Sequence, residues 1–185
     1  MTKKDMIIKE PNPILRKEAK TLSLSEIKTA KIQKLISDMK EALKNTDDGV
    51  GLAAPQVGES LRLFIVSEEA GEIDKIEKGK KELPQNYDEI RKKKVWKNYV
   101  FINPIVKNTS KNNLERAEGC LSVPGQYGIV KRNEKITVEA YDENGKKFIR
   151  GASGFVARVI QHELDHLKGT LFIDKAERTL EPEKK

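Results

Sequence analysis

The chain has 185 residues, of which 37% are hydrophobic and 35% are charged, and its formal net charge is +7. This length suits one domain, which we expect to span residues 1–185. No apolar run approaches the roughly 20 residues that a membrane-spanning helix needs. Residues 1–10 lack the apolar stretch of a secretory signal. Cys120 is the one cysteine, so an intramolecular disulfide is excluded and a reducing cytoplasm is the expected location.

The basic charge balance would allow an anionic partner such as RNA. Aromatic residues make up only 5% of the chain, and none is interleaved with a basic run. The aromatic platform on which single-stranded bases stack is therefore missing. We expect no sequence-specific nucleic-acid binding and attribute the charge to a lysine-rich background composition.

Residues 23–45 are predicted to form one amphipathic helix. Ser23 and Glu26 fit the S-x-x-E pattern of a capping box at its start. Apolar residues then recur at helical spacing, which predicts a face turned toward the core. These residues are Ile32, Leu35, Ile36, Met39 and Leu43.

Strands are predicted over residues 61–66 and 99–102, which are short apolar runs. Residues 136–141 are rich in β-branched side chains and are followed by a turn that contains Asn144 and Gly145. An Asn-Gly pair between two such runs is typical of a β-hairpin, so residues 146–149 are predicted to return as the second strand.

Residues 70–98 are predicted to be a charged insertion, because nine basic and six acidic residues lie there among few apolar ones. Pro84, Asn86 and Gly79 interrupt the segment, and only residues 87–96 are expected to be helical. The segment is therefore expected to be solvated. Residues 174–185 are also charged and are expected to fray.

A second helix is predicted over residues 153–168, with Ser153 as its N-cap and Gly169 at its end. It carries the sequence H-E-L-D-H, and His162 and His166 are the only two histidines of the chain. Their i, i+4 spacing places both rings on one helix face, which suits two ligands of one metal ion. Glu163 lies about 100° around the helix, from where it can reach a water molecule. The alternative is a pair of surface histidines with a solvated charge pair.

Cys120 is a candidate for the third ligand of such a site. It lies in the sequence E-G-C-L-S, a polar setting, although a lone cysteine can also be a small buried hydrophobe. One thiolate and two imidazoles suit Fe²⁺, Zn²⁺, Co²⁺ or Ni²⁺ and do not suit Mg²⁺ or Ca²⁺. Three protein ligands would leave an open position, as in catalytic metal sites.

Residues 49–56, G-V-G-L-A-A-P-Q, combine small side chains with a neutral donor, Gln56. The small residues allow a close approach of the backbone to another group. Gln56 could stabilise an oxyanion, but a solvent-facing turn explains the segment equally well. The Lys-Ser/Thr ending of a phosphate-binding loop is absent, which argues against a nucleotide site.

These residues together resemble the peptide deformylase family, which carries the ordered motifs G-x-G-L-A-A-x-Q, E-G-C-L-S and H-E-x-D-H. The likeness extends over residues 11–174 apart from the insertion. It implies an α+β fold, with antiparallel sheets packed around a central helix that carries the metal-binding histidines. It also implies a cytoplasmic hydrolase of protein biosynthesis and N-terminal methionine processing, which removes the formyl group of formyl-methionyl nascent peptides and releases formate.

The resemblance also assigns roles to individual residues. Cys120, His162 and His166 match the metal ligands, with Fe²⁺ as the expected ion and Zn²⁺, Ni²⁺ or Co²⁺ as substitutes in vitro. The remaining matches are Glu163 as general acid and base, Gln56 and the Leu121 N–H as oxyanion donors, Gly51 and Gly119 as peptide-pairing positions, and Arg132 as the partner of Asp165. Val50, Phe155 and Val159, with the stem of Arg158, are expected to line a pocket for the methionine side chain or else to be ordinary core residues.

Three other functions are consistent with parts of the sequence. A zinc peptidase would share H-E-x-x-H but leaves E-G-C-L-S unexplained. A deformylase-like enzyme could hydrolyse another acyl-amide, such as an acylated lysine. A basic ribosome- or RNA-binding module with a structural metal would need a fourth ligand, and only three are evident. The ribosome is expected to be a transient partner. Residues 179–185 are too few for the long C-terminal helix that some family members use there, which argues against docking by that route.

Overall fold

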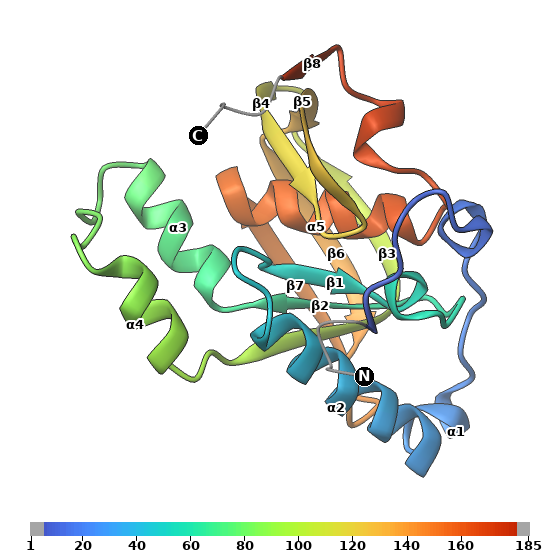
Figure 1. The fold of residues 1–185 in the computed structure, drawn as a ribbon. Coiled ribbons are helices and arrows are strands. Elements are labelled where there is room, and N and C mark those ends of the chain that lie inside the picture. Colours follow the sequence, from blue (N-terminus) through green and yellow to red (C-terminus); the bar gives the residue numbers. More distant parts are fainter. Residues whose placement is uncertain (1–5, 181–185) are drawn as a thin grey trace.

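The central feature of the fold is one helix, α5, that packs against two antiparallel sheets (Figure 1). The computed structural model describes residues 6–180, so parts of the predicted N-terminal and C-terminal segments, residues 1–5 and 181–185, lie outside it. The α-helices are α1 (Leu24–Ile27), α2 (Ala30–Lys44), α3 (Glu69–Glu77), α4 (Tyr87–Lys93) and α5 (Gly154–His166). The strands are β1 (Gly51–Ala53), β2 (Leu63–Ser67), β3 (Asn98–Thr109), β4 (Asn113–Cys120), β5 (Val123–Asn133), β6 (Lys135–Tyr141), β7 (Lys147–Ser153) and β8 (Arg178–Leu180).

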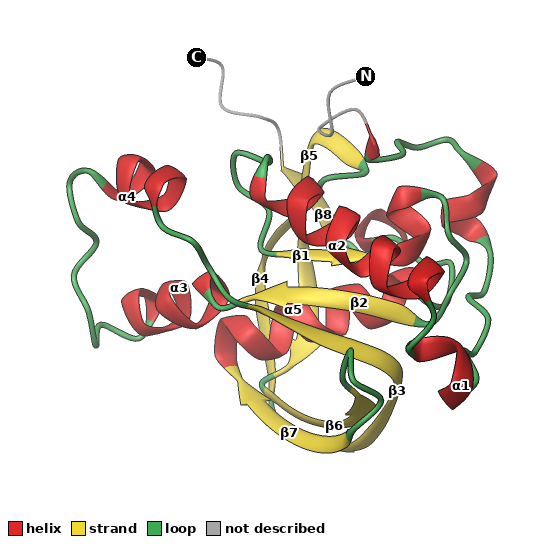
Figure 2. Ribbon diagram, turned by 90° about the horizontal axis from the view of Figure 1, so that it is seen from below, coloured by secondary structure: helices red, strands yellow, loops and turns green. Residues whose placement is uncertain are grey.

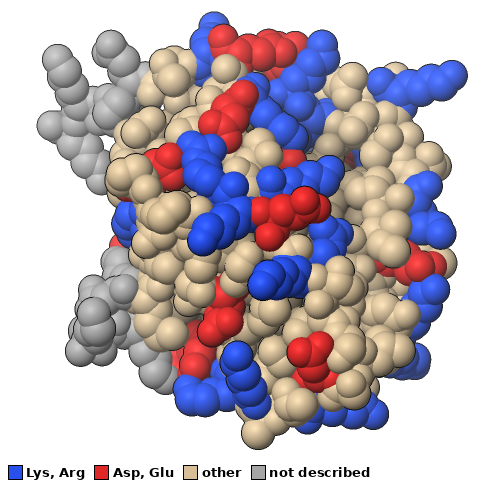
Figure 3. Space-filling view, turned by 90° about the vertical axis from the view of Figure 1, so that its right-hand side faces the viewer, with Lys and Arg blue, Asp and Glu red and all other residues tan. Residues whose placement is uncertain are grey.

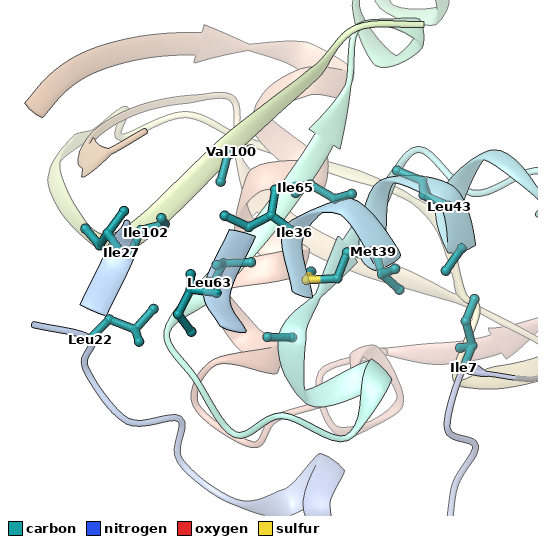
Figure 4. Packing of buried hydrophobic residues seen from close by; sticks show 14 residues of the cluster. Ile7, Leu22, Ile27, Ile36, Met39, Leu43, Leu63, Ile65, Val100 and Ile102 are labelled. Carbon is teal, nitrogen blue, oxygen red and sulfur yellow. The ribbon is translucent and has the colours of Figure 1, made fainter. Parts of the chain in front are cut away.

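The larger sheet has the order β1-β2-β3-β6-β7, and helices cover both of its faces (Figure 2). All five residues of β2 are buried, because alternate side chains point to opposite faces and each face is covered. Leu63 and Ile65 belong to one core cluster with Ile36 and Met39 of α2, as Figure 4 shows. Phe64 and Val66 belong to a second cluster with residues of α5.

The smaller sheet has the order β4-β5-β8 and lies on the other side of α5. Residues 121 and 122 form the tight connection between β4 and β5, so Cys120 is held at the end of a long hairpin. β8 pairs with β5, which shows that the predicted fraying is wrong for residues 178–180. No helix within residues 6–180 has the length and apolarity that crossing a bilayer requires.

The hairpin predicted over residues 136–149 is confirmed, and β6 and β7 pair in register around the turn. The predicted helix over residues 23–45 is two helices, α1 and α2, although the capping box of Ser23 and Glu26 is present. The break falls at Thr29, whose backbone is extended with φ −69° and ψ 149°. Its hydroxyl donates to the Glu26 carbonyl at 2.7 Å and closes the first helix, so α2 starts afresh at Ala30.

The segment between β2 and β3 contains two helices, α3 and α4, that project from one side of the molecule (Figures 1 and 2). The helix within residues 87–96 is confirmed as α4, but α3 was not predicted. α3 packs against α5, and its first residues Glu69 and Ala70 are buried, so the insertion is not wholly solvated. β3 is also longer than the predicted strand, because its distal half pairs with β6 beyond the short apolar run.

Candidate metal centre and active site

Three side chains that could hold a metal ion come together from α5 and the end of β4. His162 and His166 lie on one face of the helix with ring centroids 5.0 Å apart, as the i, i+4 spacing predicts. The end of β4 brings the Cys120 Sγ to 3.3 Å from His166 Nε2. One ligand atom from each residue lies within 4.8 Å of the other two, and no other group of this kind occurs among residues 6–180.

The donor set fits a divalent transition-metal ion. A tetrahedral ion with ligands at about 2.0–2.3 Å requires donor atoms roughly 3.3–3.6 Å apart, and the sulfur and the His166 nitrogen already have this spacing. The orientation of the His162 ring also suits metal binding, because its Nδ1 lies 3.0 Å from Glu118 Oε2. A carboxylate on Nδ1 selects the tautomer that leaves Nε2 as the donor atom for a metal. The residues present therefore fit the ion that the sequence pattern predicts.

Glu118 is the residue that sequence reasoning missed. Its carboxylate is buried and accepts hydrogen bonds from Arg132 at 2.9 and 2.8 Å and from Arg158 at 2.7 Å, besides its contact with His162. Burial alone would raise the pKa of Glu118, but Arg132 and His162 hold it well below its usual range. The carboxylate is therefore charged, and its contact with Nδ1 fixes the orientation of the His162 ring. Its place two residues before Cys120 was the only signal in the sequence.

The predicted pair of Arg132 and Asp165 is present, and Lys175 Nζ lies 2.6 Å from the other oxygen of Asp165. Arg132 therefore joins Asp165 on α5 to Glu118 on β4. The side chains of Arg132, Asp165 and Glu118 are each less than a tenth exposed. This network ties the sheet that carries Cys120 to the helix that carries the histidines.

Glu163 points into the site without joining the ligand group. It is 3% exposed, and its Oε2 has no hydrogen-bond partner within the described part of the chain. Burial raises the pKa of Glu163 to about 7. A Cβ at Gly51 would lie 2.4 Å from Glu163 Oε1, so the absence of a side chain at Gly51 makes room for this carboxylate. The alternative of a solvated charge pair is excluded.

Gln56 is buried, which excludes the solvent-facing turn as its explanation. Its Oε1 accepts from the Ala53 N–H at 2.8 Å, and this bond fixes the side-chain amide. Nε2 donates to Ser122 Oγ at 3.1 Å and lies 3.6 Å from Cys120 Sγ. Leu121, in the turn that follows Cys120, lines the same space, and its carbonyl accepts a hydrogen bond from Lys9.

A cavity of about 360 Å³ opens beside these groups. The five residues predicted to bind substrate, Val50, Gly51, Gly119, Phe155 and Val159, all line it. Tyr127, which the sequence did not single out, also lines the cavity, and its ring would lie 2.8 Å from a Cβ at Gly119. Arg158 also lines the cavity, and its guanidinium donates hydrogen bonds to Glu118 and to the Val130 and Leu114 carbonyls.

A Cys-His-His group beside a buried carboxylate and a substrate-sized cavity defines a hydrolase of the metal-dependent class. The sequence profile described as polypeptide deformylase matches residues 4–181. The chain belongs to this family, as its motifs predicted, and family members are metal-dependent enzymes.

Curated relatives and solved structures agree with this assignment. The chain is 41% identical to the peptide deformylase of Symbiobacterium thermophilum, over 91% of this chain and 65% of that protein. It is 38% identical to the chloroplastic peptide deformylase 1A of Solanum lycopersicum, over 91% of this chain and 58% of that protein. The chain is 39% identical to peptide deformylase 1 of Vibrio vulnificus, over 91% of this chain and 83% of that protein. The chain thus spans less than two thirds of the length of the first two relatives.

The peptide deformylase structure from Thermotoga maritima superposes with a TM-score of 0.74 at 31% identity, covering 93% of this chain and 97% of that one. The structure of the peptide deformylase from Acinetobacter baumannii with bound Met-Ala-Ser gives a TM-score of 0.73 at 31% identity. The match covers 91% of this chain and 96% of that one. These likenesses confirm the predicted α+β fold, with antiparallel sheets around the helix that carries the histidines.

Proposed function

We propose that the protein removes the N-terminal formyl group from formyl-methionyl peptides and releases formate and a free amino terminus. The observation that carries the proposal is the buried carboxylate of Glu163, whose Oε2 has no hydrogen-bond partner among residues 6–180. It lies beside the group of Cys120, His162 and His166, at the cavity that Glu163, Cys120 and His162 line. The names of the relatives and the Met-Ala-Ser bound to the Acinetobacter baumannii enzyme support a formyl peptide as substrate. Residues 1–185 act in this proposal as a single catalytic domain.

The metal ligands in this proposal are Cys120, His162 and His166. A divalent ion held by these residues would lower the pKa of a water molecule and polarise the formyl carbonyl. Fe²⁺ is the proposed ion, and Zn²⁺, Ni²⁺ or Co²⁺ can replace it in vitro, because one thiolate and two imidazoles suit these borderline-soft ions. A reducing cytoplasm is the proposed location, since it keeps the Cys120 thiol available as a ligand.

Glu163 and two neutral donors carry the proton and charge movements. Glu163 takes a proton from the attacking water and later gives it to the leaving amine. The formyl oxygen gains negative charge as the carbon becomes tetrahedral. Gln56 Nε2 and the Leu121 N–H stabilise that charge, and neither competes as an anionic ligand at the metal position.

The substrate backbone is proposed to pair with the open edge of β1. The Ser67 N–H donates to the Val50 carbonyl at 2.8 Å, and Leu52 is paired with Ile65. Alternate residues of an antiparallel ladder bond to the same neighbour, so the peptide groups of Gly51 point away from β2 toward the cavity. An extended peptide added there would gain main-chain hydrogen bonds. Gly119 serves the same purpose on β4, and Val50, Phe155 and Val159 enclose the methionine side chain.

Formate release from formyl-Met-Ala-Ser by protein purified without air, with its metal content measured, tests this function directly. Acetyl-Met-Ala-Ser and a formylated lysine peptide test hydrolysis of another acyl-amide. Cleavage of an internal peptide bond would instead indicate a peptidase. No formate from the metal-loaded protein would refute the proposal.

A basic ribosome- or RNA-binding module remains the alternative from another class. On the face seen in Figure 3, Lys and Arg side chains lie among Asp and Glu side chains, without one continuous basic surface. The metal group offers three protein ligands among the described residues, which suits an open catalytic position better than a closed structural site. A transient contact with the ribosome stays part of the proposal, because the nascent chain is the proposed substrate.

Replacement of Gln56 by leucine should lower kcat and kcat/KM together by about 10²–10³-fold. The Gln56 amide is already held by the Ala53 N–H, so it stabilises the transition state without reorganisation. Steady-state kinetics with formyl-Met-Ala-Ser will measure the effect, and metal content and circular dichroism serve as controls. If kcat falls by less than about fivefold while the metal is retained, Gln56 is not an oxyanion donor. The Leu121 N–H and the metal would then stabilise the oxyanion without it.

The iron-loaded protein should lose activity in air much faster than the nickel-loaded protein. A ligating cysteine is a thiolate, and thiolates beside a redox-active ion are readily oxidised. Timed assays in air, with mass spectrometry of the peptide that contains Cys120, will compare the two forms. Equal lifetimes and equal Cys120 oxidation would contradict iron as the physiological ion.

A further inference from the structure

One arginine of the α3–α4 segment reaches back to the cavity wall. Arg91 lies on α4, and its Nε donates to Glu69 Oε1 at 2.6 Å. Its Nη1 donates to the carbonyls of Thr46, at 2.9 Å, and of Asp47, and its Nη2 donates to the Gly49 carbonyl at 2.9 Å. One guanidinium therefore joins the start of α3 to the loop that follows α2.

The contacts of Arg91 are shielded from solvent. The side chains of Arg91 and Glu69 are 11% and 3% exposed, and the Tyr87 hydroxyl donates to the same Glu69 oxygen at 3.2 Å. Burial raises the pKa of Tyr87 to about 12, so this hydroxyl stays a donor. Buried, charge-assisted hydrogen bonds are stronger than exposed ones and hold their partners in one geometry.

The loop that Arg91 holds continues directly into the cavity wall. Asp48, Gly49, Val50 and Gly51 line the cavity, and Gly51 is the residue whose backbone lies against the Glu163 carboxylate. The proposed metal ligands lie on β4 and α5. The hydrogen bonds of Arg91 go to other parts of the chain, namely Glu69 and the loop that follows α2. Arg91 can therefore affect the position of β1 without touching the metal centre.

We propose that α4 is a clamp on the substrate-pairing edge of β1, and that Arg91 is its positioning residue. This inference rests on the proposed function, since it assigns the pairing of the substrate backbone to Gly51. By binding three carbonyls of one loop, the guanidinium fixes the path by which the chain enters β1. The charged segment between β2 and β3 thus contributes to peptide binding through the loop and does not contact the reacting atoms.

Arg91→Lys tests the clamp without leaving Glu69 unpaired, because lysine keeps the charge but cannot bridge the carbonyls in the planar geometry of a guanidinium. Loss of hydrogen bonds to a charged group is expected to raise KM for formyl-Met-Ala-Ser by about 10- to 100-fold. The metal content should not change, and kcat should change by less than about threefold, since the bonds act on substrate binding. Lys92→Ala, on an exposed position of the same helix, is the matched control and should leave both constants unchanged.

Two further measurements separate the clamp from a general loss of stability. Millimolar guanidinium should restore the KM of Arg91→Ala and should not alter the KM of Lys92→Ala. Amide hydrogen exchange of residues 49–52 should be faster in Arg91→Lys, while exchange of α5 stays the same. An unchanged KM, or a fall in kcat with loss of metal, would overturn the clamp.

The exchange measurement also distinguishes the clamp from the proposed function. If the wild-type protein releases no formate but Arg91→Lys still accelerates exchange at residues 49–52, the proposed activity fails and the clamp on β1 stands. If formate is released and exchange and KM are both unaffected by Arg91→Lys, the activity stands and the clamp fails.

Discussion

Replacing Glu163 with glutamine should remove nearly all formate release while the bound metal ion stays in place. Positioned proton transfer contributes about 10²–10⁴-fold to the rate of such reactions, and glutamine cannot accept the proton. Glu163 is outside the group of possible ligands and its Oε2 has no hydrogen-bond partner among residues 6–180, so its loss removes no contact that holds the ion. Single-turnover formate release and elemental analysis of the purified variant will measure the two quantities.

His162→Ala provides the comparison for this experiment, because it removes a ligand and should therefore release the metal. Glu163→Gln should resemble the wild-type protein in metal content and His162→Ala in activity. If the two variants lose metal to a similar extent, Glu163 is a ligand and its role as proton shuttle must be abandoned.

Glu118→Ala should lower the free energy of unfolding by about 3–5 kcal/mol, because it leaves buried charges without their partner. Arg132 and Arg158 both donate to this carboxylate, and their side chains are 4% and 6% exposed. Urea denaturation of the metal-free protein will isolate the loss of the network from any loss of metal. Metal affinity should fall as well, by about 10- to 100-fold, because His162 loses the group that orients it.

Glu89→Gln is the matched control for the stability measurement. Its pair with Lys93 spans 3.6 Å, and the two side chains are 68% and 80% exposed. Such an exposed pair contributes less than about 1 kcal/mol, so the variant should unfold at nearly the wild-type urea concentration. An equally small effect of Glu118→Ala would show that the buried network is dispensable for stability.

The sequence predicted best where a local pattern determines the structure. The i, i+4 histidines, the hairpin around Asn144-Gly145 and the capping box of Ser23 all follow from neighbours within a few residues. The ordered motifs further identified the family and, with it, the two-sheet fold. The positions of Gln56 and Gly51 at the cavity agree with the roles expected for them, although these roles remain proposals.

The features that were missed depend on contacts between distant residues. α3 is charged along its sequence, and only its packing on α5 shows that Glu69 and Ala70 are buried. Glu118 looks like a polar residue beside a cysteine until the fold brings Arg132, Arg158 and His162 around it. The break at Thr29 is an exception, because its cause is local. The capping box at Ser23 and the apolar spacing that begins at Ile32 were joined into one predicted helix, whereas the Thr29 hydroxyl ends the first helix.

The short length of β1 has a consequence for self-association. An open strand edge is a template on which another copy of the same chain can pair, and long flat edges promote aggregation. β1 extends only over Gly51–Ala53, and the Ala53 N–H is already bonded to Gln56. The edge that would receive a peptide is therefore too brief to build an intermolecular ladder. A narrow, unfolded chain end can enter the cavity beside it, whereas a folded second molecule finds too few free backbone groups to hold it there.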